Sequence, residues 1–525
     1  MTGTDIVIGS GPAGVSAAHA LLARARRVRM IDVGETLEEE LNARRLRMAA
    51  TAPASWAPDD AAAAKSRPHE RDGDVMRPYG SNFPVRDCVG FFDKAGPPSN
   101  MALRPSFARG GLSNGWGSSV APYRSEDLGA WPAATRNLAA HYEAVSRFMP
   151  ISASRDGLED VFPMWRVNEA HAFRAEPQGG ELLARLSGRK AALARTGVVA
   201  GRARLAFRGE DCLACGLCLV GCPYGLIFSA ASALNALAED KNFTYESGLR
   251  AVRFESRDQS AALVVENIKS GERSTIEGDR LFIGAGVLST ARIVLNSMPD
   301  TIRALTLRDS QHLLMPMLHQ WAPPRDLAFG PRNTLAQAFV EMNDPAISPM
   351  TIHTQIYGYN DFLKPDLVSK FGALSGILAP AIDFVSRRLL VAQMFAHSDH
   401  CGEIELRLNG APGDARLDFD AREGASTRAV LMKAAGKLAR TLSPSGVIAL
   451  PFQARTGAVG SSFHVGASLP MSQTPGCGQT DIHGRIFGAN RVHVIDASVF
   501  PSVPATTITF SVMANAHRIA TDAPL

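Results

Sequence analysis

The first 32 residues contain the pattern that most limits how this chain can fold. An apolar segment, residues 5–8, leads into a glycine turn, and a second apolar segment, residues 28–31, ends at Asp32. The turn has the form G-x-G-x-x-G, with Gly9, Gly11 and Gly14. In such a strand, turn, helix and strand, a pyrophosphate lies against the glycines and the helix N-terminus, and the acid accepts hydrogen bonds from the ribose. We therefore predict a Rossmann-like dinucleotide site, which by itself is compatible with FAD or NAD.

Three later segments favour FAD. Residues 109–117 form a glycine-dense loop, residues 281–295 read as strand, glycine turn and helix, and residues 484–514 read as strand, turn and helix once more. With these segments the chain resembles the glucose-methanol-choline (GMC) oxidoreductases, whose FAD domain is assembled from discontinuous pieces.

The resemblance implies an α/β fold with two domains. A Rossmann-like FAD-binding domain is expected over residues 1–130, 205–300 and 459–525. An α+β substrate domain with an antiparallel sheet is expected over residues 131–204 and 301–458.

The resemblance also implies further FAD-binding residues. Asp496 resembles the aspartate beside the flavin ribityl chain, and Val252 resembles the strand residue on the adenine side. The other expected contacts are Gly111, Asn114 and Thr507. Pyranose oxidases carry a flavin-linked histidine just before the tryptophan of this loop; Gly115 occupies that position here, which implies a non-covalent FAD.

Four of the seven cysteines fall within eleven residues. Cys212, Cys215, Cys218 and Cys222, followed by Pro223, have the C-x-x-C-x-x-C-x-x-x-C-P spacing of bacterial ferredoxins. We predict an iron–sulfur cluster, either [4Fe–4S] or [3Fe–4S]. A structural zinc site and metal-free packing are the alternatives.

The spacing alone does not assign the fourth ligand of such a cluster. In two-cluster ferredoxins the last cysteine of this run binds the other cluster, and here there is no second run. Cys222 is our choice, and the other candidates are Cys88, Cys401 and Cys477.

His464 is the predicted catalytic base. Hydride leaves a carbinol carbon only as the hydroxyl proton is taken, which suits an imidazole. The segment around it resembles the family's histidine segment, but reads H-x-G where H-x-x-G is usual, so an ungapped alignment puts Phe463 in the catalytic place. Ala505 stands where the family has a second His or Asn; Thr506 or Thr507 could replace it as a hydrogen-bond donor but not as a base.

Residues 352–359 read as a strand in the substrate region. The period of two places His353, Gln355, Tyr357 and Tyr359 on one face. This face suits a hydroxyl-rich ligand; the solvated face of an antiparallel sheet is the alternative.

Composition excludes several classes of protein. The net charge is only +4 and we find no long basic block, so a nucleic acid partner is not expected. The longest uncharged apolar run, residues 371–382, is too short to span a membrane, and a strand begins too near Met1 for a signal peptide, so a cytoplasmic location is expected. Residues 362–395 combine apolar runs with four cations; a lid or peripheral membrane contact is one interpretation, and a buried helix is the other.

These patterns together predict an FAD and iron–sulfur dehydrogenase. It would oxidise a sugar-like or other alcohol and pass electrons to a one-electron acceptor protein or a quinone rather than to O₂. Two alternatives remain open. One is a flavoprotein, fed by reduced ferredoxin, that reduces a carbonyl or alkene; the other is a non-catalytic flavoprotein with structural zinc.

Overall fold

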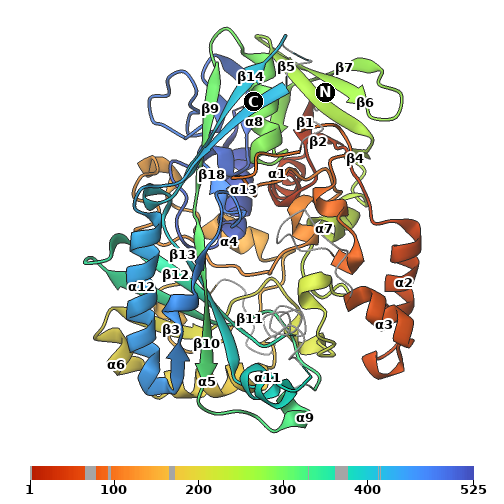
Figure 1. Cartoon of the computed structure of the whole chain (residues 1–525). Helices are drawn as coiled ribbons and strands as arrows, with labels where there is room; N and C mark the ends of the chain where they lie inside the picture. Colours follow the sequence, from red (N-terminus) through yellow and green to blue (C-terminus); the bar gives the residue numbers. More distant parts are fainter. Residues whose placement is uncertain are drawn as a thin grey trace.

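The computed structural model describes residues 3–65, 78–92, 96–164, 172–328, 330–360, 376–411, 413 and 416–524. Its four sheets gather segments that are far apart in the sequence, and both ends of the chain lie in the same half of the molecule (Figure 1).

The nucleotide-binding half is built on a six-stranded, mainly parallel sheet. Its strands, in spatial order, are β19 (Arg485–Ile486), β20 (Ala489–Val494), β8 (Arg280–Ile283), β1 (Thr4–Ile8), β2 (Arg27–Ile31) and β4 (Phe243–Glu246). Only the edge pair of β19 and β20 is antiparallel. The strands β1, β8 and β20 are almost completely buried, as expected for a parallel sheet covered on both faces.

Helices and a small sheet cover this core. The helices are α1 (Pro12–Ala23), α7 (Ala230–Leu237), α8 (Val287–Ser297) and α13 (Thr509–Asp522), and the sheet contains β5 (Leu249–Ser256), β6 (Ala261–Asn267) and β7 (Arg273–Gly278). The predicted order of strand, glycine turn and helix is therefore present at residues 5–23 and 281–295.

The last helix begins later than the sequence suggested. Within the strand, turn and helix read over residues 484–514, we expected the helix at residues 501–514, whereas α13 begins at Thr509 and extends to Asp522. Pro501 and Pro504 explain the delay, because proline lacks an N–H and disfavours helical geometry in the residue before it. The intervening residues are consequently free to form the irregular segment beside the cavity described below.

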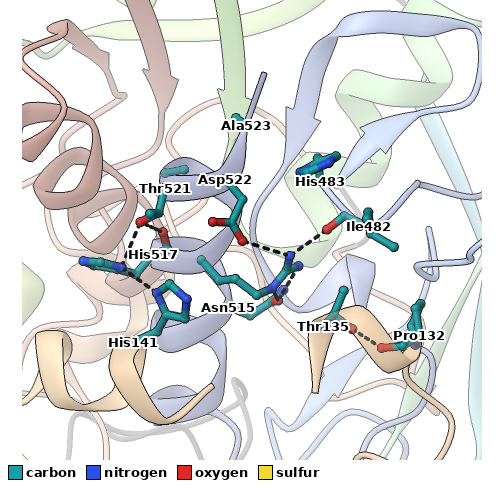
Figure 2. Close-up of polar contacts among 12 residues, drawn as sticks. Pro132, Thr135, His141, Ile482, His483, Asn515, His517, Thr521, Asp522 and Ala523 are labelled. Carbon is teal, nitrogen blue, oxygen red and sulfur yellow. Dashed lines mark hydrogen bonds and ion pairs between the residues drawn. The ribbon is translucent and has the colours of Figure 1, made fainter. Parts of the chain in front are cut away.

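Figure 2 shows how α13 is held against the rest of this half. His517 Nδ1 lies 3.0 Å from Nδ1 of His141 in α4 (Ala139–Val145), so one ring nitrogen donates and the other accepts. Burial lowers the pKa of His517 to about 4. Next to it, Arg518 donates to the Ile482 carbonyl at 2.8 Å. These contacts hold the C-terminal half of α13, and the first turn of the same helix, with Thr509 and Val512, borders the cavity.

The second half is an antiparallel sheet. Its strands, in spatial order, are β16 (Val447–Ala449), β10 (His312–His319), β13 (Leu389–Phe395), β12 (Ser348–Gly358), β11 (Ala336–Asp344) and β3 (Val198–Arg202), and β17 (Arg455–Thr456) pairs with β10. One face packs its apolar side chains against α12 (Thr427–Leu442) and α5 (Pro177–Ser187), and α12 runs along the sheet in Figure 1. The other face is turned toward the nucleotide-binding half.

A four-stranded sheet joins the two halves. It consists of β15 (Arg416–Arg422), β14 (Glu403–Asn409), β9 (Ala304–Asp309) and β18 (Val465–Gly466). Its apolar residues, among them Leu307 and Ile404, share one core with the six-stranded sheet. Part of the region assigned to the substrate domain therefore packs with the FAD-binding half, and the domain limits at 301 and 458 stay predictions.

The remaining helices lie at the periphery. They are α2 (Glu39–Ala49), α3 (Pro58–Lys65), α6 (Lys190–Ala194), α9 (Arg325–Ala328) and α11 (Ala379–Ser386). Of the predicted lid, residues 361–375, with Lys364 and Lys370, lie outside the described residues, and the remainder forms α11 and the central strand β13. Among the described helices, none is both long and apolar enough to cross a membrane.

Candidate functional site

A single cavity of about 1510 Å³ lies between the two halves. Pockets for drug-sized ligands are typically about 300–1,000 Å³, so this cavity has room for a dinucleotide together with a substrate. Its walls come from the N-terminal glycine turn, the loop over residues 111–119, the turn after β8, the segment of residues 455–465 and one face of the antiparallel sheet.

Each of the three glycines in the N-terminal turn is required for a different structural reason. Gly9 has a φ of +94°, and a Cβ there would lie 2.6 Å from the Gly284 carbonyl oxygen. A Cβ on Gly14 would lie 1.9 Å from the Gly9 carbonyl oxygen, so this glycine lets helix and strand pack closely. A Cβ on Gly11 would meet no atom within 4 Å, because Gly11 faces the cavity. This open space at the N-terminus of α1 fits a pyrophosphate.

Asp32 lies at the end of β2 and lines the cavity. Its carboxylate accepts hydrogen bonds from the Ser10 hydroxyl and, at 3.2 Å, from the Tyr245 hydroxyl. Burial raises the pKa of Asp32 to about 6, although both hydroxyls favour the charged form. A ribose that donates two hydroxyl hydrogens would compensate this buried acceptor.

Replacing Asp32 with alanine is expected to weaken FAD binding by about 1.5–3 kcal/mol, the usual contribution of hydrogen bonds to a charged group. FAD affinity of the unmodified protein should also fall as the pH drops below about 6, because the protonated carboxyl loses acceptor capacity. Titration of apoprotein with FAD measures both effects, and Asp418→Ala, at an exposed carboxylate on β15, is the matched control. Unchanged FAD affinity in Asp32→Ala would contradict this role.

The loop over residues 109–117 is folded by its own polar side chains. Asn114 donates 2.8 Å hydrogen bonds to the Arg109 and Gly111 carbonyls, so it shapes the loop from behind. Gly111 lines the cavity, and a Cβ there would lie 3.3 Å from the Gly11 Cα. The two glycine segments therefore meet at the position that a dinucleotide would occupy. Trp116 is anchored through its indole N–H to the Phe228 carbonyl at 2.9 Å.

Asp496 follows β20 and also lines the cavity. Its carboxylate accepts from the Gly286 N–H at 3.1 Å, the Thr290 hydroxyl at 2.5 Å and the Ser498 N–H at 3.0 Å. Burial nevertheless raises its pKa. The carboxylate thus joins the turn after β8 to the segment after β20, with one side open to the cavity.

Two of the predicted cofactor residues lie behind the wall. Val252 sits at a bulge in β5 with 4% exposure, whereas its neighbours Arg250 and Ala251 line the cavity. Thr507 is buried, and its hydroxyl accepts from the Ala121 N–H at 2.9 Å, so it supports the loop that lines the cavity.

His464 also lines the cavity, in a tight loop before β18. Its N–H donates to the Ser462 hydroxyl at 2.9 Å, and its ring stacks on Phe395 with centroids 4.7 Å apart. Asp309, fully buried, accepts from the Gly460 N–H at 2.6 Å and from the Ser462 hydroxyl at 2.7 Å. Asp309 therefore holds the loop that carries His464.

Burial lowers the pKa of His464 to about 3, and His353 and His312 add smaller effects in the same direction. The imidazole is therefore neutral at neutral pH, the form that can accept a proton. Its buried Nδ1 has no hydrogen-bond partner in the part of the chain that the structure describes.

Phe463 and the segment of Ala505 and Thr506 are the other positions considered for catalysis from the sequence. Phe463 also lines it, with a φ of +58° that turns the chain sharply. Ala505 is buried, and Thr506 lies 3.5 Å from an Asp127 oxygen. Ala505 itself therefore brings no imidazole or amide to this position.

The loop of residues 212–222, here called the cysteine loop, packs between helices α2 and α3 on one side and the start of the antiparallel sheet on the other. The Arg332 N–H donates to the Ala214 carbonyl at 2.7 Å, and Leu217 packs against Met48 and Ala64. Leu219 and Val220, between Cys218 and Cys222, line the large cavity. The loop therefore borders the proposed FAD site directly.

The four thiols of the loop lie within electrostatic reach of one another. Burial raises the pKa of Cys215 to about 12, and Cys222 and Cys212 raise it further; burial raises the pKa of Cys218 too, with contributions from the other three. Cys212 and Cys218 also accept backbone N–H···S hydrogen bonds at 3.3 and 3.4 Å. Four thiols with such donors have the chemistry of an iron–sulfur ligand set.

The side chains do not form a finished coordination sphere. Within the described ranges, no three His, Cys, Asp or Glu side chains are gathered closely enough to hold a metal ion. Two of the three alternative fourth ligands have other partners: Cys401 Sγ lies 3.6 Å from the Ala396 carbonyl and Cys477 Sγ 2.8 Å from the Thr301 carbonyl.

Several residues of the site carried no recognisable signal in the sequence. Ser10 is one of the x positions of the G-x-G-x-x-G turn, and Tyr245 and Asp309 are single polar residues in strands. Ser10 could have been suspected because it lies between Gly9 and Gly11. Tyr245 could have been suspected only once it was known that β4 lies next to β2 in the sheet.

Known proteins share this arrangement. A family model described as GMC oxidoreductase matches residues 397–516, which include the His464 loop, Asp496 and most of α13. In fold, the chain is similar to pyridoxine 4-oxidase from Mesorbium loti, with a TM-score of 0.58 and 15% sequence identity over 98% of both chains. No curated protein sequence matches. The family match over the His464 segment and the fold shared over almost the whole length confirm the predicted resemblance of this chain to the glucose-methanol-choline (GMC) oxidoreductases.

Proposed function

We propose that this GMC oxidoreductase is an FAD and iron–sulfur dependent dehydrogenase. Its substrate is a sugar-like or other primary or secondary alcohol, and its electrons leave through the cluster to a one-electron protein acceptor or a quinone. One observation carries the proposal: the glycine turns, His464 and the cysteine loop all border the same cavity. The predicted cytoplasmic location and domain limits remain part of this proposal.

His464 is the residue proposed to take the hydroxyl proton. FAD, when bound, supplies the acceptor for the hydride that leaves the carbinol carbon. The neutral His464 ring lines the same cavity as the glycine turns, and Asp309 and Ser462 hold its loop in place. Because Gly115 offers no imidazole for a covalent link, the proposed FAD is non-covalent.

Cys212, Cys215, Cys218 and Cys222 are proposed to hold the cluster. Their spacing is that of ferredoxins, and the thiols are close enough to raise one another's pKa. An iron–sulfur centre passes electrons singly, which suits a one-electron acceptor better than O₂. Leu219 and Val220 leave only a short stretch of loop between these cysteines and the FAD cavity.

The experiment is metal and sulfide analysis of anaerobically purified protein, with low-temperature EPR. Iron and acid-labile sulfide at three or four per chain, with an EPR signal in one oxidation state, are expected. Full zinc occupancy without sulfide would favour the structural zinc alternative. Anaerobic bleaching of the flavin by alcohols rather than by reduced ferredoxin would establish the direction of electron flow.

A further inference from the structure

A buried chain of hydrogen bonds leads from Glu341 to the cavity wall. Glu341 on β11 and His353 on β12 are 1% and 0% exposed, and the Glu341 Oε1 lies 2.6 Å from the His353 Nδ1. The His353 Nε2 lies 3.2 Å from the Gln355 Nε2. Gln355 lines the cavity on the face of the antiparallel sheet, here called the substrate wall. A carboxylate deep in the sheet is therefore connected to that wall.

The donors and acceptors of this chain are fixed by chemistry. An amide nitrogen can only donate, so the Gln355 Nε2 donates to His353 Nε2, and the His353 proton resides on Nδ1, where Glu341 accepts it. The Gln355 Oε1 can only accept, and it receives the Tyr357 hydroxyl at 2.6 Å and the Ser119 hydroxyl at 3.0 Å. Glu341 therefore sets the direction of every hydrogen bond up to the wall.

Tyr357 and Ser119 are consequently left as acceptors. Each hydroxyl has one proton and two lone pairs. The Tyr357 proton is directed to Gln355, and the Ser119 proton to Gln355 or to the neighbouring Tyr357 oxygen, so each hydroxyl keeps a lone pair for the cavity. Both residues line the cavity, and the Tyr357 hydroxyl lies next to Gly117 of the loop that borders the proposed flavin site. Burial raises the pKa of Tyr357 to about 12, so the phenol remains neutral.

We infer that Tyr357 and Ser119 accept a hydrogen bond from a second hydroxyl of the substrate, and that Glu341, His353 and Gln355 are positioning residues that keep both oxygens as acceptors. The inference rests on the proposed function, in which the substrate is an alcohol. It narrows the substrate class to polyols and sugars, which carry a hydroxyl beyond the one that reacts.

The polarity of this wall also distinguishes an alcohol from a carbonyl compound. A carbonyl oxygen has no proton to donate, so it would face two acceptors without forming a hydrogen bond. A substrate hydroxyl donates to either oxygen. Gln393, directly across from Gln355 in the register of β12 and β13, lines the same wall and offers an amide to further hydroxyls.

The test uses holoenzyme and matched pairs of probes: cis-1,2-cyclohexanediol against cyclohexanol, and glycerol against 1-propanol. Anaerobic flavin reduction gives KM and kcat. We expect each diol or triol to have the lower KM, and Tyr357→Phe to raise that KM about 3- to 10-fold, the size of one neutral hydrogen bond. The KM for the mono-alcohols, kcat and FAD content should not change. Tyr359→Phe, which removes a buried phenol that does not line the cavity, is the control.

Glu341→Leu tests the positioning role. Without the carboxylate, the His353 proton can move to Nε2, Gln355 then turns its amide, and Tyr357 turns its proton toward the cavity. The ratio of cis-1,2-cyclohexanediol to 2-hydroxycyclohexanone affinity, measured by flavin difference spectra, should fall, which loss of packing alone would not produce, because the two probes differ only in whether the second oxygen carries a proton. A ratio that stays as in the parent protein would overturn the positioning role.

The inference and the proposed function can fail separately. If no alcohol reduces the flavin, the proposed function fails, and the dissociation constants of the same probes from difference spectra still test the wall. If Tyr357→Phe keeps the diol preference, or loses FAD instead, the inference is overturned whatever the enzyme oxidises.

Discussion

Serine in place of Cys218 is expected to remove the iron and acid-labile sulfide and to abolish electron transfer to cytochrome c. Cys218 is the most buried of the four loop thiols, and its sulfur accepts the Thr334 N–H. A hydroxyl is a poor ligand for an iron–sulfur centre. The loss should exceed the roughly 10- to 100-fold effects typical of residues that only support metal ligands.

Flavin reduction by alcohol should survive in Cys218→Ser, because serine is close to cysteine in size and the His464 wall is untouched. Stopped-flow bleaching of the flavin and steady-state cytochrome c reduction separate the two steps. Cys477→Ser, at an exposed thiol, is the matched control and should behave like the parent protein. Undiminished cytochrome c reduction in Cys218→Ser would exclude the cluster as the electron exit.

Alanine in place of His464 should slow flavin reduction by roughly 10²- to 10⁴-fold, the usual size of a lost general base. FAD content should be retained, since the glycine turns and Asp32 belong to other segments of the cavity lining and are left unchanged. No second imidazole stands at Ala505 to take over the proton. Rapid-mixing measurements under anaerobic conditions, with His483→Ala as the control outside the cavity, give the ratio of rates.

The pH dependence adds an independent signature. Because burial holds the pKa of His464 near 3, the base is neutral from pH 5 to 8, and the reduction rate should stay level on the acid side over that range. It should fall only as the pH approaches 3, where the imidazole becomes protonated. Full activity in His464→Ala together with a loss in His397→Ala would place the base elsewhere on the substrate wall.

Local motifs made the nucleotide-binding half predictable. The G-x-G-x-x-G turn between two apolar strands allows few backbone paths, because Gly9 and Gly14 stand where any side chain would collide with backbone. The same holds for the strand and helix at 281–295. The resemblance to the GMC oxidoreductases followed from these segments, and the family match over residues 397–516 confirmed it. The start of the last helix was misjudged, because apolar content near Pro501 outweighed the two prolines in that interpretation.

The alternation in residues 352–359 correctly placed Gln355 and Tyr357 on one face of the strand. It could not predict whether that face borders the cavity, the solvent or another part of the protein. The contact with the cavity depends on the registers of β10, β12 and β13, which are set by strands more than thirty residues apart. The same period put Tyr359 with them, although it lies beyond the strand and is buried away from the cavity.

By itself, then, the sequence determined the dinucleotide fold, the family and the four-cysteine loop, because each depends on residues within a few positions of one another and on backbone sterics. Only the tertiary structure decided that Asp309 holds the His464 loop, that Glu341 reaches the substrate wall through His353, and that the cysteine loop borders the FAD cavity. These contacts join strands and loops that are distant along the chain. Their geometry follows from sheet register and from the packing of the two halves, which no local spacing encodes.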